Sequence, residues 1–141
     1  LRHARELLTA KPTSIETVDS KVLGLAKGDI IWNSVSDFFP ENIGENIQGI
    51  NLVEYTGNDE REVADKIKIL TDKLDALAKQ GGSSALGYTI AMGHDSVNKL
   101  WAMRKKSVGL LGNAKGEKRP IPFVEDTAVP PENLADYIME I

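Results

Sequence analysis

A stripe of apolar residues with helical spacing is the strongest constraint on how this chain can fold. The stripe consists of Val63, Ile67, Leu70, Leu74 and Leu77. Because an α-helix turns once every 3.6 residues, intervals of four and three place these side chains on one face. Asp59 with Glu62 resembles a capping box at the start, and Gly81 with Gly82 ends the pattern near residue 80. The sequence therefore predicts a long helix that buries one face.

Short segments with the pattern of β-strands lie on both sides of this helix in the sequence. They are rich in β-branched or aromatic residues and bounded by turn-forming residues. We expect strands over residues 14–18, 50–56, 86–92 and 121–129. We expect further helices over residues 20–26 and 95–111, after Pro131, and before Lys11–Pro12. In the third strand, alternation places four large apolar side chains on one face: Leu86, Tyr88, Ile90 and Met92.

The order of these elements predicts the fold class. We expect an α+β protein with a mostly antiparallel sheet and helices on one face, specifically a ferredoxin-like variant. Residues 29–49 do not fit the pattern, and we interpret them as an irregular segment with one helical turn. Their apolar side chains are candidates for an exposed surface that another domain covers: Ile30, Ile31, Trp32, Phe38 and Phe39.

Length and composition exclude several classes of protein. The 141 residues fit a single domain. The formal net charge of -4 argues against a nucleic-acid-binding protein, which usually has a basic excess. The absence of cysteine excludes disulfides and thiolate metal sites, and the two histidines have no metal-ligand spacing. No apolar run approaches the ~20 residues of a transmembrane helix. We therefore expect no metal, nucleic-acid partner or transmembrane segment.

Both ends of the chain lie inside helical patterns. Residues 1–8 run straight into one, and residues 133–141 stop within another, without a cap or a polar tail. We therefore expect residues 1–141 to form one domain that is an internal fragment of a larger protein.

Arg104 is the residue that departs most from its surroundings. By the helical period it belongs to an apolar stripe made of Val97, Leu100, Trp101, Val108 and Leu111. An arginine within such a stripe needs a partner, because an unpaired buried charge is costly. One interpretation is an ion pair with Glu125 or Asp126. The other is a fork that binds a substrate carboxylate, which the planar guanidinium suits.

Glu125 and Asp126 are weaker candidates for a binding site. Neighbouring residues on a strand point to opposite faces, so these two carboxylates cannot form one catalytic dyad. One of them can still pair with Arg104, and both can equally be solvated charges at the end of a strand.

Two segments together resemble a known family. Residues 100–106 (LWAMRKK) and 123–131 (FVEDTAVPP) are similar to the C-terminal substrate domain of FAD-linked oxidases. This family includes glycolate oxidase, D-lactate dehydrogenase and D-2-hydroxyglutarate dehydrogenase. The segments 12–19 and 108–116 resemble the long bacterial members that also carry a C-terminal iron–sulfur region. The resemblance covers roughly residues 10–141.

The resemblance implies a function for the intact protein. It would oxidise a 2-hydroxy acid of the D-2-hydroxyglutarate or D-lactate type to a 2-oxo acid, passing a hydride to FAD. An N-terminal domain outside this chain would hold most of the FAD, and an iron–sulfur cluster would lie beyond the C-terminus. Arg104 would help to hold the substrate carboxylate. A substrate-binding lysine of the hydroxyglutarate enzymes falls at Val124, which puts the precise substrate in doubt.

Two hypotheses follow from the sequence. In the first, the chain is an inactive fragment of an FAD-dependent 2-hydroxy-acid dehydrogenase that is cytoplasmic or peripheral to the inner membrane. Its partners would be the small 2-hydroxy acid and the remainder of its own polypeptide. In the second, the chain is a non-enzymatic, ferredoxin-like module that binds a ligand or regulates another domain.

Overall fold

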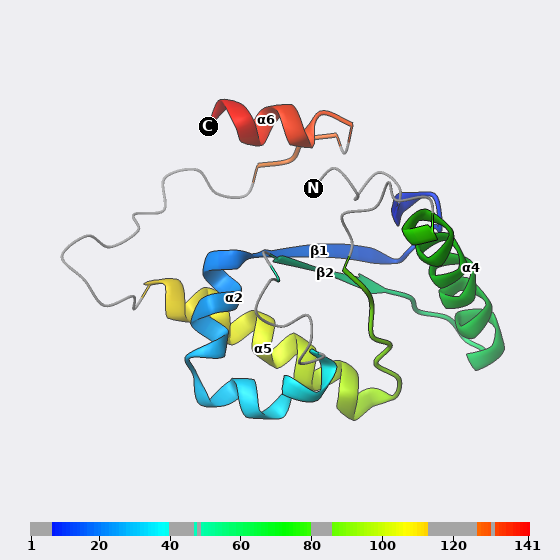
Figure 1. The fold of residues 1–141 in the computed structure, drawn as a ribbon, viewed down its shortest axis with the longest axis horizontal. Helices are drawn as coiled ribbons and strands as arrows, with labels where there is room; N and C mark the ends of the chain where they lie inside the picture. Colours follow the sequence, from blue (N-terminus) through cyan, green and yellow to red (C-terminus); the bar gives the residue numbers. More distant parts are fainter. Residues whose placement is uncertain (1–6, 40–46, 48, 80–85, 113–126, 131) are drawn as a thin grey trace. The chain divides into compact units, whose positions relative to one another are not determined.

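A computed structural model describes residues 7–39, 47, 49–79, 86–112, 127–130 and 132–141 (Figure 1). In these residues the chain forms two strands, four α-helices and two short 3₁₀ helices. They are β1 (Ser14–Asp19), α2 (Ser20–Lys27), η1 (Ile30–Ser34), η2 (Ser36–Phe38), β2 (Gly49–Glu54), α4 (Glu60–Lys79), α5 (His94–Gly112) and α6 (Leu134–Glu140). The combination confirms the α+β class.

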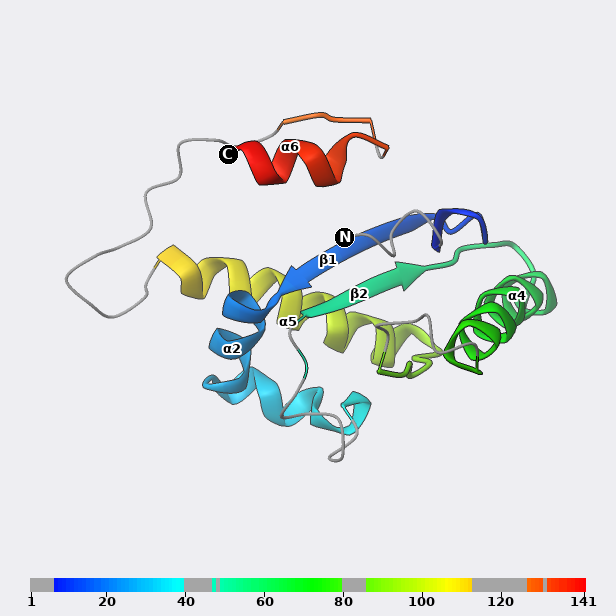
Figure 2. The same cartoon turned by 45° about the horizontal axis from the view of Figure 1, so that its top comes forward.

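The two strands pair with each other and run in opposite directions (Figure 2). Next to the sheet, the backbone N–H of Thr13 donates to the carbonyl of Glu54 at 2.8 Å. Across it, the Thr17 hydroxyl donates to the side-chain oxygen of Asn51 at 2.8 Å. A side chain at Gly49 would place its Cβ 2.9 Å from the Val18 carbonyl oxygen, so the close approach of the strands there requires glycine.

The third expected strand is not formed. Residues 86–92 have no regular secondary structure, and the four alternating apolar side chains of this segment are all exposed. Alternation describes where side chains point, whereas a strand also needs a neighbour for its backbone hydrogen bonds. Of the fourth expected strand, residues 127–129 are irregular and the others lie outside the described residues. The ferredoxin-like arrangement therefore stays a prediction.

The chain divides into two compact units, each with its own core. The first contains the described residues 7–17, 51–79, 127–130 and 132–141. Its buried residues are Leu7, Ala10 and Leu70, with Ile15, Val53, Tyr55 and Leu74 packed against them. The Tyr55 hydroxyl donates to the Ala10 carbonyl at 3.3 Å, and partial burial raises the pKa of this phenol.

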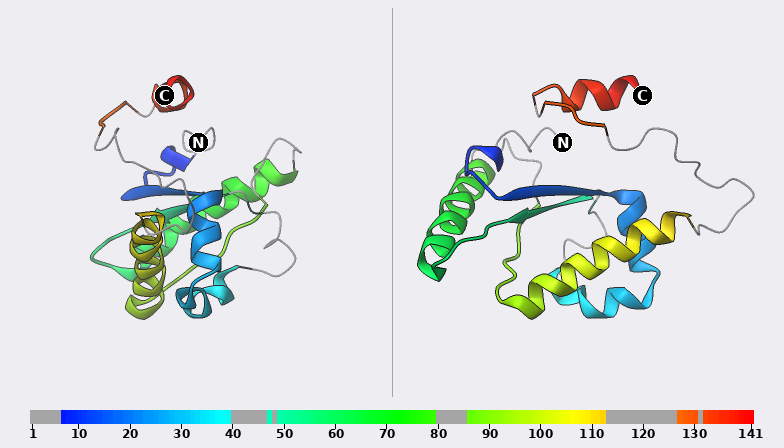
Figure 3. Two further views of the ribbon diagram at one scale, coloured as in Figure 1. Left: turned by 90° about the vertical axis from the view of Figure 1, so that its left-hand side faces the viewer. Right: turned by 180° about the vertical axis from the view of Figure 1, so that it is seen from behind.

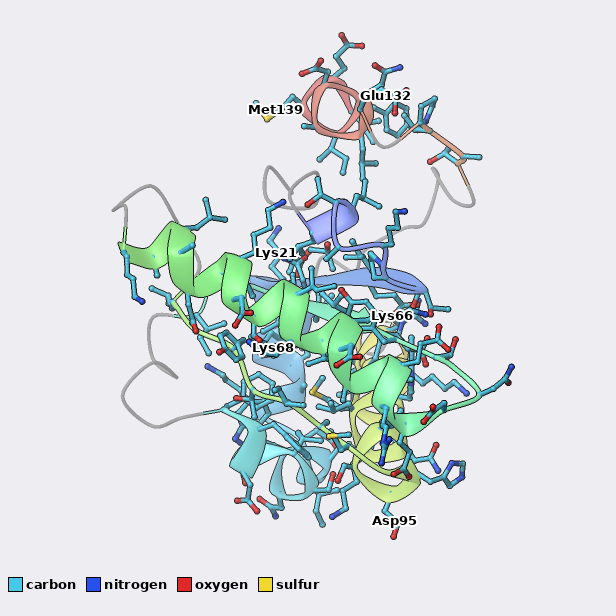
Figure 4. All side chains as sticks on the ribbon, turned by 90° about the vertical axis from the view of Figure 1, so that its right-hand side faces the viewer. Lys21, Lys66, Lys68, Asp95, Glu132 and Met139 are labelled. Atoms are coloured by element: carbon cyan, nitrogen blue, oxygen red, sulfur yellow. The ribbon has the colours of Figure 1, made fainter. Side chains whose placement is uncertain are left out.

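Helix α4 confirms the apolar stripe that the sequence predicts. All five residues of the stripe are buried or half-buried, while Ile69, which lies on α4 outside the stripe, is 59% exposed. Lys66 and Lys68, labelled in Figure 4, form i,i+4 ion pairs with Glu62 and Asp72, both at 2.6 Å. Such exposed pairs contribute little stability, so the buried stripe holds α4 in place.

The second unit contains the described residues 18–39, 47, 49–50 and 86–112. Helix α2 packs against α5, and η1 contacts both (Figure 3). The Asp19 carboxylate caps α2 by accepting from the Val22 N–H at 2.8 Å, and Gly28 ends this helix. Three side chains with no exposed surface form the centre of the core: Ala26, Val35 and Met103.

The irregular segment does not form the exposed apolar surface that we expected. Ile31, Trp32, Phe38 and Phe39 pack against the core of the second unit. The rings of Trp32 and Phe39 lie 4.5 Å apart between centroids. Only Ile30 among the five is strongly exposed, at 77%. The two 3₁₀ helices give this segment enough order to cover Met103 of α5.

No helix among the described residues is long and apolar enough to cross a membrane.

Candidate functional site on helix α5

Helix α5 carries Arg104, and the residues at its start favour a helix. Gly93 precedes it with φ +83°, a left-handed conformation that suits glycine. Asp95, labelled in Figure 4, lies in the first turn, where a negative charge interacts well with the helix dipole. The helix then continues without interruption to Gly112.

One face of α5 is completely buried. Met103 and Ser107 have no exposed surface, and Leu100 packs beside them against the core. The Ser107 hydroxyl donates to the Met103 carbonyl at 2.7 Å, one turn earlier. This internal hydrogen bond satisfies the hydroxyl, so serine can occupy an apolar face without an energetic penalty.

The buried face is not the one that we expected from the sequence. We placed Arg104 in a stripe with Val97, Leu100, Trp101, Val108 and Leu111. Of these, Leu100 packs against the core, but Val108 is 52% exposed, and Val97, Trp101 and Arg104 are half-buried. Successive residues of a helix are about 100° apart, so this second face lies beside the one with Met103. Helix α5 therefore has two apolar faces, and the core of its unit uses only the first. Arg104 lies on the second, where apolar surface is still accessible.

Three cations occupy consecutive positions of α5 and lie in different environments. The Lys106 ammonium is 2.8 Å from Oδ1 of Asp29, and the same oxygen accepts the N–H of Ile31 at 2.9 Å. The hydrogen bond from Lys106 is the main cause that lowers the pKa of Asp29, and the Ile31 N–H adds to it. Lys105 is exposed and makes no hydrogen bond or ion pair in the described part of the chain. Arg104 is half-buried.

The other sequence candidates cannot be placed. Glu125 and Asp126 lie outside the described residues, and so does Val124. The ion pair that we considered between Arg104 and one of these carboxylates therefore stays a prediction. His94 is exposed at the start of α5, and no group of residues suited to a metal occurs in the described parts of the chain.

Sequence reasoning missed the contact between Asp29 and Lys106. Asp29 precedes Ile30 and Ile31, and an aspartate before an apolar run is a signal for a helix start. This signal did not predict η1, because a five-residue 3₁₀ helix is too short to show periodicity in its sequence. Its partner on α5 is 77 positions later in the chain (106 − 29) and could not be assigned from spacing.

The described residues do not fit a flavin-binding site. Gly49 and Gly57 have no room for a side chain, but the atoms that occupy this space belong to Val18 and Val63 of this chain. Neither glycine therefore leaves space for a ligand. The start of α5 has an open glycine, Gly93, but Asp95 beside it would repel a phosphate. What remains is a cationic helix face with apolar neighbours, which can hold an anionic organic group.

The described residues define a class of fold: two paired strands with α-helices, an α+β protein. The whole chain, residues 1–141, matches the model of the family described as FAD linked oxidases, C-terminal domain. The chain therefore belongs to this family.

The chain is also similar to curated bacterial proteins named D-2-hydroxyglutarate dehydrogenase. It is 51% identical to the one from Pseudomonas putida, 49% to the one from Haemophilus influenzae and 46% to the one from Escherichia coli. Each match extends over 140 residues, 99% of this chain and 14% of the relative. The chain thus spans about one seventh of the length of these proteins. No solved structure matches it.

Proposed function

We propose that residues 1–141 are an internal part of the substrate-binding domain of an FAD-linked dehydrogenase. The intact protein would oxidise a 2-hydroxy acid, of the kind that names the relatives, to a 2-oxo acid. Membership of the FAD-linked oxidase family supports this hypothesis over the non-enzymatic module. The observation that carries it is the position of Arg104 on a face of α5 that the core does not use.

The surroundings of Arg104 suit a carboxylate. A guanidinium offers two parallel N–H donors that match the two oxygens of a carboxylate. Val97 and Trp101 on the same face are half-buried, which lowers the local dielectric and strengthens the pairing relative to a fully solvated cation. The rigid α5, held by Met103 and Ser107, fixes the point from which Arg104 extends.

The role of this chain would be to bind and orient the substrate. FAD supplies the oxidising chemistry in this family, and we propose that other parts of the polypeptide hold it. An iron–sulfur cluster beyond the C-terminus and a cytoplasmic location, with contact to the inner membrane at most, belong to the same proposal. They rest on the likeness of segments 12–19 and 108–116 to long bacterial members.

Replacement of Arg104 by lysine in the full-length protein tests the proposal. Lysine keeps the charge but loses the two-pronged geometry. We expect kcat/KM for D-2-hydroxyglutarate to fall about tenfold or more, which corresponds to about 1.4 kcal/mol of transition-state binding. The melting temperature should change little, because Arg104 is outside the buried face of α5.

The opposite result would identify a structural arginine. If Arg104→Lys lowers the melting temperature and leaves kcat/KM intact, the residue is a partner of a fixed carboxylate such as Glu125 or Asp126. The proposed substrate site would then be wrong.

A further inference from the structure

Lys105 differs from two other cations of the second unit, Lys106 and Lys27. Lys106 is held by Asp29, and the Lys27 ammonium lies 5.6 Å from the centre of the Trp32 ring. Lys105 has neither kind of contact in the described part of the chain, and its side chain is exposed. In the described part of the chain, no group therefore neutralises its charge.

Helical geometry places Lys105 on the accessible face of α5. With about 100° per residue, Trp101 and Val108 lie at neighbouring angles, between those of Arg104 and Lys105. Val108 is 52% exposed and Trp101 is half-buried. The face thus has an apolar ridge with one cation on each side. A ligand lying across this ridge could contact both cations and the apolar atoms between them.

We infer that Lys105 holds the second carboxylate of a 2-hydroxy dicarboxylate whose first carboxylate is bound by Arg104. This inference rests on the proposed function and adds a residue that selects between substrates. Two anionic groups joined by a short aliphatic chain match two cations separated by an apolar ridge. A monocarboxylate would leave Lys105 without a partner, so this residue would favour the dicarboxylate.

The size of the effect follows from the exposure of Lys105. An ion pair at a solvated position has modest strength and is weakened by salt. In the full-length protein, Lys105→Gln should raise KM for 2-hydroxyglutarate by up to about fivefold, the upper end of the range for an exposed pair. It should leave kcat/KM for 2-hydroxybutyrate unchanged, because this compound lacks the second carboxylate.

Lys99 provides a matched control. It lies on the same helix, is exposed and has no ion pair in the described residues, but helical spacing places it on the side of Lys106. Lys99→Gln removes the same charge and should change neither substrate's kcat/KM. The inhibition constants of glutarate and butyrate provide the same comparison for compounds that the enzyme does not oxidise. The Lys105→Gln substitution should weaken inhibition by glutarate only.

The outcomes separate this inference from the proposed function. If Arg104→Lys impairs both substrates but Lys105→Gln affects both equally or neither, the inference is overturned and the proposed function stands. An effect of Lys99→Gln as large as that of Lys105→Gln would also overturn it, since a general loss of positive charge would explain both. If Arg104→Lys affects no 2-hydroxy acid, the proposed function itself fails.

Discussion

At the scale of single residues, one carboxylate oxygen connects two elements of the second unit. Oδ1 of Asp29 caps η1 through Ile31 and pairs with Lys106 of α5. The Asp29 side chain is only 19% exposed, against 43% for Lys106. This contact lies two residues from Arg104 and helps to hold η1 against the helix that carries the proposed site.

The lowered pKa of Asp29 leads to a prediction about pH. A carboxylate whose pKa is lower in the folded than in the unfolded chain stabilises the fold above its unfolded pKa, about 3.9. This stabilisation is lost as the pH falls through the folded pKa. We expect Asp29→Asn to destabilise the chain at pH 6 and to have little effect near pH 2, as measured by urea unfolding.

Titration of the Asp29 carboxyl by NMR gives a second measurement. Lys106→Met should raise its pKa toward the usual value but not fully, because the N–H of Ile31 still donates to the same oxygen. An unchanged pKa in Lys106→Met would mean that the ion pair is absent in solution.

At the scale of elements, α5 shows how one helix can serve two surfaces. The face with Met103 and Ser107 packs on α2 and η1, and the face with Arg104 and Val108 is left accessible. Packing of the first face determines where the second one points. A binding residue on a packed helix is held more rigidly than one on a loop, which favours a defined ligand geometry.

Truncation of one residue on each face of α5 tests this division. Met103→Ala removes a fully buried side chain and should lower the free energy of unfolding by about 2–5 kcal/mol. Val108→Ala removes a side chain that is 52% exposed and should cost less than about 0.5 kcal/mol. Urea denaturation of both variants provides the comparison, and equal losses would show that the two faces have been assigned wrongly.

At the scale of the whole molecule, the chain has two cores and accounts for about one seventh of its relatives' length. In the described part of each unit, only a few side chains are buried. Several large apolar side chains remain exposed, among them those of Leu86, Tyr88, Ile90 and Met92 before α5 and Met139 on α6. Met139, labelled in Figure 4, is 85% exposed.

The residues of this chain predict whether it retains bound flavin during purification. Among the described residues, the open glycine at the start of α5 has Asp95 beside it, which would repel the flavin pyrophosphate, so we expect the 141-residue chain to purify colourless. Absorption spectra after incubation with FAD and gel filtration provide the measurement. A yellow chromophore retained in a stoichiometric amount would contradict the proposal that other parts of the polypeptide hold the flavin.

Local signals in the sequence determined most of the elements. The stripe of α4 and the short helix α2 were both predictable, because they depend on residues within one or two turns of each other. The strand that we expected over 86–92 is not formed, because a strand also depends on a distant partner, which local signals do not reveal. The prominence of Arg104 was visible in the sequence, as was the family resemblance of the segments around it.

Only the tertiary structure decided which face of α5 is buried. A stripe centred on Val97 and Trp101 and a face centred on Met103 and Ser107 both fit a helical period, with Leu100 between them, so the sequence could not rank them. Ala26 and Val35 resolve the choice, because their small side chains leave room for Met103 at the centre of the core. Arg104 thereby stays on the accessible face, since it lies about 100° further around the helix than Met103.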